Sequence, residues 1–354
     1  MSFILPYSFI FIFSVLPMLL WSEKIFKSSQ GFSAADRFFI SLLLAPACVS
    51  TLLFYLLWLL PKQKPIFYPG MIVVIGLIGI ISRLYRSKVR PTLNMQTSIY
   101  KIKSIIIPGN LPPLGLISFL LFISIIQIAS GEVNDHDWFE YGTLGKVLFQ
   151  KKQILFQKVK YFKETGFYFI GLHGYTVPLF KTMEEFINAI IGARDDFFFR
   201  TISYYYNILL FTWICLKLLK INVWASTLYL LLMIINIKAF STIFSICSID
   251  PVRLSLLYIF LYTIYRLQKS NEFTTYLLLG FLAGIAAFVH SLSMIITSLA
   301  IGVIVLVDLY KQPRGNKLIQ AGVLILVFLL SGGIYYLMET LSGTGWIFQE
   351  INYY

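Results

Sequence analysis

The chain concentrates residues that could do acid–base or metal chemistry in one short segment, residues 131–152. The segment reads "GEVNDHDWFEYGTLGKVLFQKK" and follows directly on the apolar run "LISFLLFISIIQIAS". Its first part holds four acids and one histidine, namely Glu132, Asp135, His136, Asp137 and Glu140. A carboxylate such as Asp135 or Asp137 can act as a general base, and two together can hold a divalent cation such as Mg²⁺ or Mn²⁺. The alternative interpretation is an ordinary helix N-cap, formed by Asn134 or Asp135.

Further charged residues and histidines lie where apolar segments begin or end. They are His173 in "GLHGYTVPLF", Arg200 in "ARDDFFFRTISYYY", Asp250 and Arg253 in "CSIDPVRLSLL", and His290 in "AAFVHSLSM". An arginine at a membrane surface can bind the phosphate of a lipid head group. The structural alternatives are a helix cap by Asp195 or Asp196, an ion pair between Asp250 and Arg253, and histidines with no role beyond packing.

The composition is that of a protein with many membrane spans. The chain has 354 residues, of which 58% are hydrophobic and 13% charged, with a mean hydropathy of +0.79. Soluble domains carry about 25% charged residues. The net charge of +13 lies mostly in short loops, where it sets membrane orientation and does not indicate nucleic-acid binding. The three cysteines have neither metal-site nor disulfide spacing.

The hydropathy pattern predicts an all-α polytopic membrane protein with about ten transmembrane helices. They fall at 2–21, 38–60, 67–83, 112–130, 202–219, 222–240, 251–267, 274–290, 293–309 and 318–337. The loop "SRLYRSKVRPTLNMQTSIYKIK" holds six basic residues and no acid, which predicts a cytoplasmic position. Counting on from it places residues 131–200, Asp250, Arg253 and His290 outside. The localisation expected is therefore an inner or plasma membrane, with the candidate site extracytoplasmic.

Three parts follow from this pattern. The first part, residues 1–103, holds the N-terminal spans and the basic loop. The second, residues 104–337, is a transmembrane module that includes the long outer loop 131–200. The third, residues 338–354, is an extracytoplasmic end. The outer loop is too long to lack structure. Helical spacing in "WFEYGTLGKVLFQ" predicts one interfacial helix. The stretch "FYFIGLHGYTVPLFKTMEEFINAIIGA" predicts a second, interrupted near Gly174 and Pro178.

These segments together resemble the integral-membrane glycosyltransferases of the GT-C fold, the class of protein mannosyltransferases and lipid A aminoarabinose transferases. The resemblance rests on "NDHDWFEYGTLGKVLFQKKQ", "GLHGYTVPLF", "GARDDFFFRTISYYYNILLF", "SIDPVRLSLLYIFLYTIYRL" and "LLLGFLAGIAAFVHSLSMI". It covers residues 112–337 and implies a seven-helix module with one large outer loop after its first span. Three extra spans precede the module here, and the family's paired prolines are reduced to Pro178.

The resemblance implies an inverting transfer from a polyprenyl-phosphate sugar to a hydroxyl of a glycan, lipid or protein. Asp135 or Asp137 would be the catalytic base, and either or both could hold a divalent cation. Lys146, Arg200 and Arg253 would bind the phosphate. His136, His173, Asp250 and His290 complete the expected substrate site. The alternatives are an O-antigen-type polysaccharide polymerase or ligase, a non-enzymatic lipid or glycan transporter, and a structural subunit.

Overall fold

The computed structural model describes most of the chain. It covers residues 4–27, 30–86, 110–130, 136–154, 159–162, 167–170, 174–194, 196–235, 249–267, 272–311 and 315–341. At some helix ends and in both strands it describes the backbone alone. Asp135, His173 and Asp195 lie outside these ranges, as does the segment 338–354 beyond its first four residues.

The N-terminal third is made of three long apolar helical stretches. The first is α1 (Ile4–Ile10), the π-helical segment η1 (Phe11–Val15) and α2 (Leu16–Ile25), which follow one another without a break. The second is α3 (Ala34–Leu59), and the third is α4 (Phe67–Arg86). Buried side chains run along α3 from Asp36 to Leu57, because α2, α4, α8 and α9 all pack against it. This helix is therefore the centre of the bundle.

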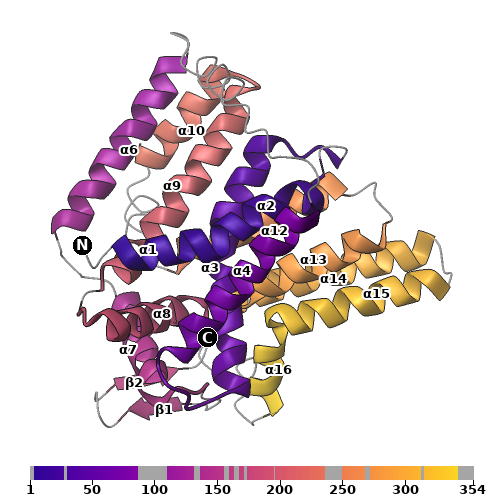
Figure 1. Cartoon of the computed structure of the whole chain (residues 1–354). Helices are drawn as coiled ribbons and strands as arrows, with labels where there is room; N and C mark the ends of the chain where they lie inside the picture. The colour runs from indigo at the N-terminus through magenta and orange to yellow at the C-terminus, as the bar shows by residue number, and fades with distance from the viewer. Residues whose placement is uncertain are drawn as a thin grey trace.

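The middle of the chain carries three apolar helices, with a small packed layer between the first and the second. After α6 (Leu111–Ser130) come α7 (His136–Lys151), the strands β1 (Val159–Phe162) and β2 (Phe167–Ile170), and α8 (Thr176–Ile191). The strands form an antiparallel hairpin with Val159 opposite Ile170. Next come α9 (Phe197–Leu219) and α10 (Val223–Ile235), and α6, α9 and α10 pack together at the upper left of Figure 1.

The C-terminal third is a group of packed helices in which α13 and α15 run in the same direction. It comprises α12 (Asp250–Leu267), α13 (Phe273–Ala287), α14 (Ser291–Lys311) and α15 (Gly315–Phe328). The π-helical segment η4 (Leu329–Gly333) then leads into α16 (Ile334–Leu341), with a non-helical backbone conformation at Gly332. The helix α13 packs against both α14 and α15, as Figure 1 shows at the right.

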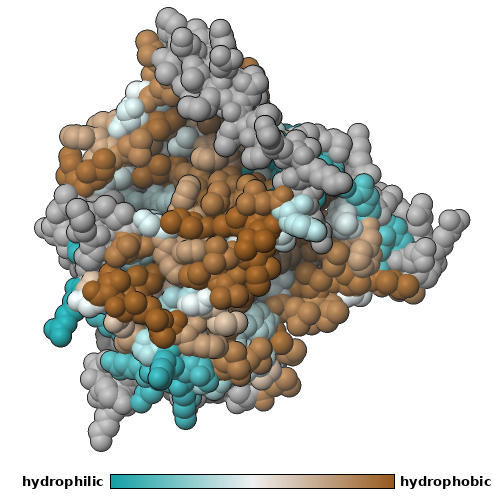
Figure 2. Space-filling model, in the orientation of Figure 1, coloured by the Kyte–Doolittle hydropathy of each residue, from teal (hydrophilic) through white to brown (hydrophobic). Residues whose placement is uncertain are grey.

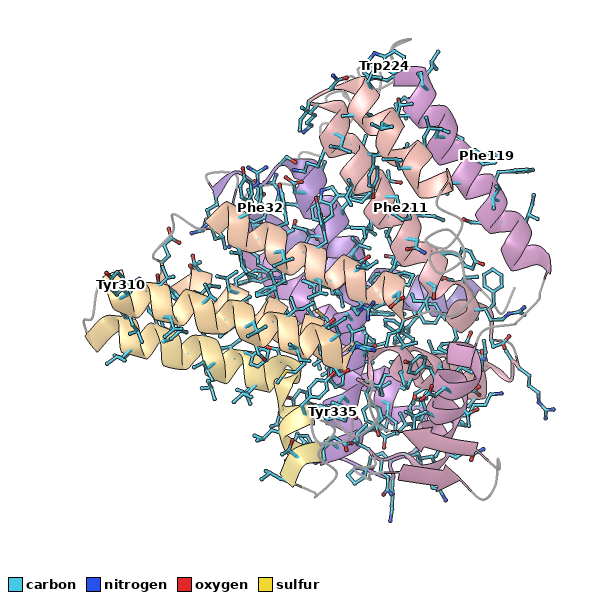
Figure 3. All side chains as sticks on the ribbon, turned by 180° about the vertical axis from the view of Figure 1, so that it is seen from behind. Phe32, Phe119, Phe211, Trp224, Tyr310 and Tyr335 are labelled. Carbon is cyan, nitrogen blue, oxygen red and sulfur yellow. The ribbon has the colours of Figure 1, made fainter. Side chains whose placement is uncertain are left out.

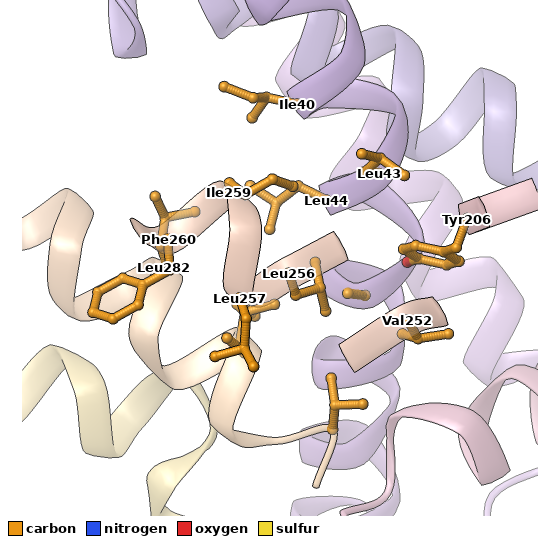
Figure 4. Packing of buried hydrophobic residues seen from close by; sticks show 14 of the residues in the cluster. Ile40, Leu43, Leu44, Tyr206, Val252, Leu256, Leu257, Ile259, Phe260 and Leu282 are labelled. Carbon is orange, nitrogen blue, oxygen red and sulfur yellow. The ribbon is translucent and has the colours of Figure 1, made fainter. Parts of the chain in front are cut away.

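The main core joins α3, α9, α12 and α13. Figure 4 shows Ile40, Leu43 and Leu44 of α3 facing Leu256 and Ile259 of α12. Outside the core, large apolar side chains are exposed along the helices; Phe119, Trp224 and Tyr310 point outward in Figure 3. In Figure 2, apolar residues cover the middle of the face, and hydrophilic ones gather near the end where α7 and α8 lie. Such an apolar belt is what a bilayer requires.

The prediction of a helical membrane protein is supported, and two details differ. Six helices in the described part are long and apolar enough to cross a membrane: Leu5–Ile25, Ala34–Leu59, Phe67–Tyr85, Phe197–Leu219, Ser291–Tyr310 and Lys317–Leu341. Each of the other four predicted spans also overlaps a helix, α6, α10, α12 or α13, but none of these meets the same criteria. The count of ten spans therefore stays a prediction. The β1–β2 hairpin was not expected in an all-α chain.

Candidate functional site

The acidic segment leads into the first predicted interfacial helix. The helix α7 begins at His136, so His136 and Asp137 lie in its first turn, where their backbone alone is described. Asp135 falls just before the described residues of this helix. The predicted capping and base roles of Asp135 and Asp137 therefore stay predictions. Lys146 is exposed on the side of α7 that faces away from its buried residues.

The helix α7 is held in place by an apolar face. Tyr141, Leu144, Val147 and Leu148 are buried, which confirms the helical spacing predicted from the sequence. They pack mainly on α8, where the hydroxyl of Thr182 donates to the carbonyl oxygen of Gly145 at 3.0 Å. On the other side, a Cβ placed on Gly142 would stand 3.3 Å from the ring of Phe199. The acidic helix is thereby fixed beside the first turn of α9, one residue from Arg200.

The second predicted helix differs from expectation in three ways. The stretch "FYFI" is strand β2, and the helix begins only at Thr176. Pro178 lies in its first turn, where a proline is compatible with a helix, so it does not interrupt α8. The helix is also buried from Thr176 to Asn188, except at Glu185, because α3, α7 and α9 surround it. It is therefore a packed element and not one lying on a surface.

The predicted site residues that are described gather at one end of the bundle. Helices α9 and α12 run in the same direction, since Ser255 contacts Tyr206 near their starts and Tyr262 contacts Lys217 near their ends. Arg200 and Arg253 therefore begin neighbouring helices on the same side. We name this side the α7–α8 end.

His290 lies at the same end, and Gly174 packs close to it. Gly174 packs against the end of α13 so tightly that a Cβ there would stand 1.7 Å from the carbonyl oxygen of Phe288. Only a glycine fits such a close backbone approach. His290 itself caps α14, because its Nδ1 accepts from the backbone N–H of Leu292 at 3.0 Å. His290 therefore has a structural contact, its predicted role in substrate binding stays a prediction, and His173 lies outside the described residues.

Both arginines have a carboxylate on their own helix. Arg253 contacts Asp250 at 2.7 Å, as the local-pair alternative predicted. Arg200 lies 3.8 Å from Asp196, which is ion-pair distance but longer than a hydrogen bond. All four side chains are partly exposed. A phosphate bound at either arginine would therefore compete with a carboxylate that is already within ion-pair distance.

The residue that organises this end was missed by the sequence analysis. Glu184 of α8 is fully buried, and its Oε1 accepts from the backbone N–H groups of Phe198 at 2.8 Å and Phe199 at 3.4 Å. Asp196 occupies the N-cap position of α9 but makes no side-chain capping bond there, while Asp195, the other predicted cap, lies outside the described residues. The cap comes instead from a different helix. This fixes the first turn of α9, and with it the position of Arg200.

Glu184 is balanced by a buried cation. The ammonium of Lys181 lies 3.0 Å from Glu184 and 2.9 Å from Glu185. Burial raises the pKa of Glu184 to about 7, even though Lys181 and the two backbone donors oppose that rise. Burial lowers the pKa of Lys181, but the charges of the two glutamates outweigh it and hold the pKa above its ordinary value. The cluster therefore places a carboxyl group that titrates near neutral pH, Glu184, next to the candidate site.

No family model, no curated protein and no solved structure matches this chain.

Cavities and metal groups do not mark the candidate site. Two of the cavities in the described part of the chain measure about 350 and 340 Å³, and neither of these two is lined by a predicted site residue. The second lies between the first span and α9, lined by Tyr7, Phe198 and Tyr205 among others. Among the residues whose side chains are described, no group of three potential ligands could hold a metal ion. Asp135 and Asp137 are carboxylates of the kind that hard cations prefer, but their side chains are not among those described.

A second buried charge cluster lies at the opposite end of the bundle. Asp36, at the start of α3, is fully buried and forms an ion pair with Lys217 of α9. The indole N–H of Trp213 donates to Asp36 at 2.9 Å, the hydroxyl of Tyr262 at 3.1 Å and the backbone N–H of Ser33 at 2.8 Å. This network ties α3, α9 and α12 together, and nothing local in the sequence indicated it.

Proposed function

We propose that this protein is a membrane glycosyltransferase that moves a sugar from a polyprenyl-phosphate donor to a hydroxyl acceptor on the extracytoplasmic face. One observation carries the proposal. The segment between α6 and α9 forms a packed layer, in which Gly142, in the second turn of α7, packs against Phe199, the residue before Arg200. The GT-C resemblance implies such a loop after the first span of the module.

The chemistry needs an acid–base group and a cation close together. Asp135 or Asp137 takes the proton of the acceptor hydroxyl while its oxygen attacks the anomeric carbon. The carbon–oxygen bond to the phosphate breaks on the opposite face, so the configuration inverts. The lipid phosphate leaves as an anion, and a nearby cation stabilises the charge that develops on it. A base in this role contributes about 10² to 10⁴ in rate.

Arg200 is the best-placed cation for the phosphate. It begins α9 next to Phe199, the residue against which Gly142 of α7 packs. Arg253 begins the neighbouring helix α12, where Asp250 pairs with it at 2.7 Å, and is the second candidate. Lys146, exposed on α7 itself, can reach an anion that approaches the acidic end of that helix from outside the bundle.

A lipid or glycan transporter is the second candidate, because two spans contain a π-helical segment and one of these segments is kinked. The first span contains η1, and the last contains η4 with its kink at Gly332. Transporters often place substrates at broken helices. Neither segment carries an ionisable side chain, however, since they read "FIFSV" and "LLSGG". An ion-coupled or charge-binding centre at these segments would need such a group.

The test measures sugar transfer by the purified chain in lipid nanodiscs. A panel of radiolabelled polyprenyl-phosphate sugars serves as donors, and release of free polyprenyl phosphate is followed with alcohol acceptors present. Asp135→Asn, Asp137→Asn and the double variant are compared with the wild type. Glu140→Gln is the matched control, because it removes one negative charge from the same helix. We expect the double variant to lose about 10² to 10⁴ in rate while it still binds donor.

The outcomes separate the two candidates. Transfer that survives in the double variant overturns the base assignment. A wild type that binds a donor and moves it across the bilayer of a vesicle without cleaving it supports the transporter. A loss in Glu140→Gln equal to that of the aspartate variants shows a general effect of charge on the helix and not catalysis by a particular carboxylate.

A further inference from the structure

The larger cavity lies at the end of the bundle opposite the candidate site. It measures about 350 Å³ and is formed where α2 and α12 end and α13 begins. Its lining residues are Met18, Lys24, Ile25, Phe26, Lys27, Gln30, Leu44, Leu267, Thr274, Thr275, Leu277, Leu278 and Phe281. The exposed members include both lysines and Thr274, whereas Phe26, Leu44 and Leu267 are buried. The cavity therefore has a basic rim and an apolar floor.

The rim carries the marks of a membrane–water interface. The ammonium of Lys24 lies 5.5 Å from the ring centre of Trp21, and the indole N–H of Trp21 donates to the carbonyl oxygen of Gly79 at 2.9 Å. Tryptophan is enriched at the level of lipid head groups. A lysine next to it extends its ammonium toward water while its stem stays on apolar surface. The mouth of the cavity is thereby placed at head-group height and its floor below.

Two polar features at the rim fit an anionic head group. Lys27 is paired with Glu272 at 3.2 Å, but both side chains are about half exposed, and such surface pairs contribute little. Among the described residues, the buried amide oxygen Oε1 of Gln30 has no hydrogen-bond partner. A buried acceptor of this kind costs free energy until a donor reaches it. A hydroxyl-bearing head group would supply that donor.

We propose that this cavity binds one anionic phospholipid of the leaflet at this end, with its phosphate between Lys24 and Lys27. The acyl chain lies on the floor formed by Phe26, Leu267 and Phe281, and a head-group hydroxyl donates to Gln30. The cavity volume falls within the range of small-molecule sites. Each lysine near an anionic lipid strengthens binding about 5-fold, so the two together contribute roughly 25- to 30-fold. The site is independent of the proposed transferase chemistry at the α7–α8 end.

The experiment uses native mass spectrometry of the full chain in neutral detergent, titrated with phosphatidylglycerol. Phosphatidylcholine and inorganic phosphate are parallel probes. The variants are Lys24→Gln with Lys27→Gln, and Leu278→Trp, which fills the cavity. The matched control is Lys62→Gln with Lys64→Gln, two exposed lysines in the turn between α3 and α4 at the other end. Size-exclusion elution and thermal unfolding check that each variant is folded.

We expect one high-affinity phosphatidylglycerol, bound roughly 25-fold more weakly by the Lys24–Lys27 variant and unchanged in the control. Leu278→Trp is expected to abolish the site while the charges remain. Equal affinity for phosphatidylcholine, or equal loss in the control, overturns the proposal. So does full competition by inorganic phosphate, since the floor would then have no role. Tighter binding of a polyprenyl phosphate at the same lysines would overturn the assigned occupant.

Discussion

Replacing Glu184 tests whether a buried carboxylate from one helix sets the start of another. Its Oε1 caps Phe198 and Phe199 of α9, and its Oε2 pairs with Lys181. Glu184→Gln keeps an oxygen for the cap and removes the charge. Glu184→Ala removes the cap and the charge together and leaves a void. The two variants therefore separate the hydrogen bonds from the ion pair.

The structure sets the size of each effect. Loss of an N-cap costs about 0.5 to 2 kcal/mol, and breaking a buried ion pair about 3 to 5 kcal/mol. Lys181 still pairs with Glu185 at 2.9 Å after the substitution. The cost of breaking the ion pair with Glu184 should therefore lie near the lower end of its range, about 3 kcal/mol. We expect Glu184→Ala to lower the free energy of unfolding by about 4 kcal/mol. Glu184→Gln at neutral pH should cost less, because the protein no longer has to hold a buried charge there.

The pH dependence gives a sharper signature. Burial raises the pKa of Glu184 from its ordinary 4.5 to about 7, so the folded state binds its proton more tightly than the unfolded state does. The stabilisation from this proton is complete below pH 4.5 and is lost as the pH rises toward 7. A rise of this size corresponds to about 3 kcal/mol. Wild-type stability should therefore fall between about pH 4.5 and 7, and Glu184→Gln should remove that fall.

The assay follows thermal unfolding in detergent by circular dichroism, because the described residues are mostly helical and the signal does not depend on the titration of a thiol. Melting curves are recorded from pH 4.5 to 8 for the wild type and both variants. Glu185→Gln serves as the control, since Glu185 pairs with the same lysine without capping α9. Parallel pH curves for the wild type and Glu184→Gln would refute the reasoning, as would an alanine variant as stable as the wild type.

Two further predictions concern stability. Asp36→Asn should destabilise the fold by about 3 to 5 kcal/mol, because it leaves the ammonium of Lys217 without its charged partner; adding Lys217→Met should recover part of the loss, measured in the same thermal assay. Gly174→Ala should cost at least about 1 to 3 kcal/mol, because the new methyl would meet the carbonyl oxygen of Phe288 at 1.7 Å. Gly192→Ala is the comparison variant, because φ is +70° there and no atom lies within 4 Å of the new methyl group. Its loss of stability measures backbone strain alone, whereas that of Gly174→Ala measures steric overlap.

The features that the sequence predicted correctly are those set by residues a few positions apart on one helix. The helical spacing of Tyr141, Leu144 and Leu148 matches the buried face of α7. The pair of Asp250 and Arg253 three residues apart is also present. Such features follow from the period of a helix, which any short stretch of sequence displays.

Features that depend on tertiary contact could not be predicted. The hairpin lies in an aromatic stretch, "FYFI", whose four residues fit a strand or a helix equally well. The cap of α9 comes from Glu184, fourteen residues earlier, where Asp196 was the ordinary choice. The partners of Asp36 on α9 and α12 are 177 and 226 residues away. Only the packing of the helices reveals these pairs.

The π-helical segment η4 makes the register of the last helix depend on a single residue. Such segments hold one more residue per turn than an α-helix, and here the next element, α16, buries Tyr335 fully and Tyr336 almost fully. Removing one residue from "LLSGG" would restore a regular turn and rotate everything after it by about 100°. Tyr335 would then swing away from Tyr175 and Phe54, the rings that it contacts, and the half-exposed Leu337 would be drawn toward the interior. The end of the chain thus tolerates many substitutions more easily than one deletion.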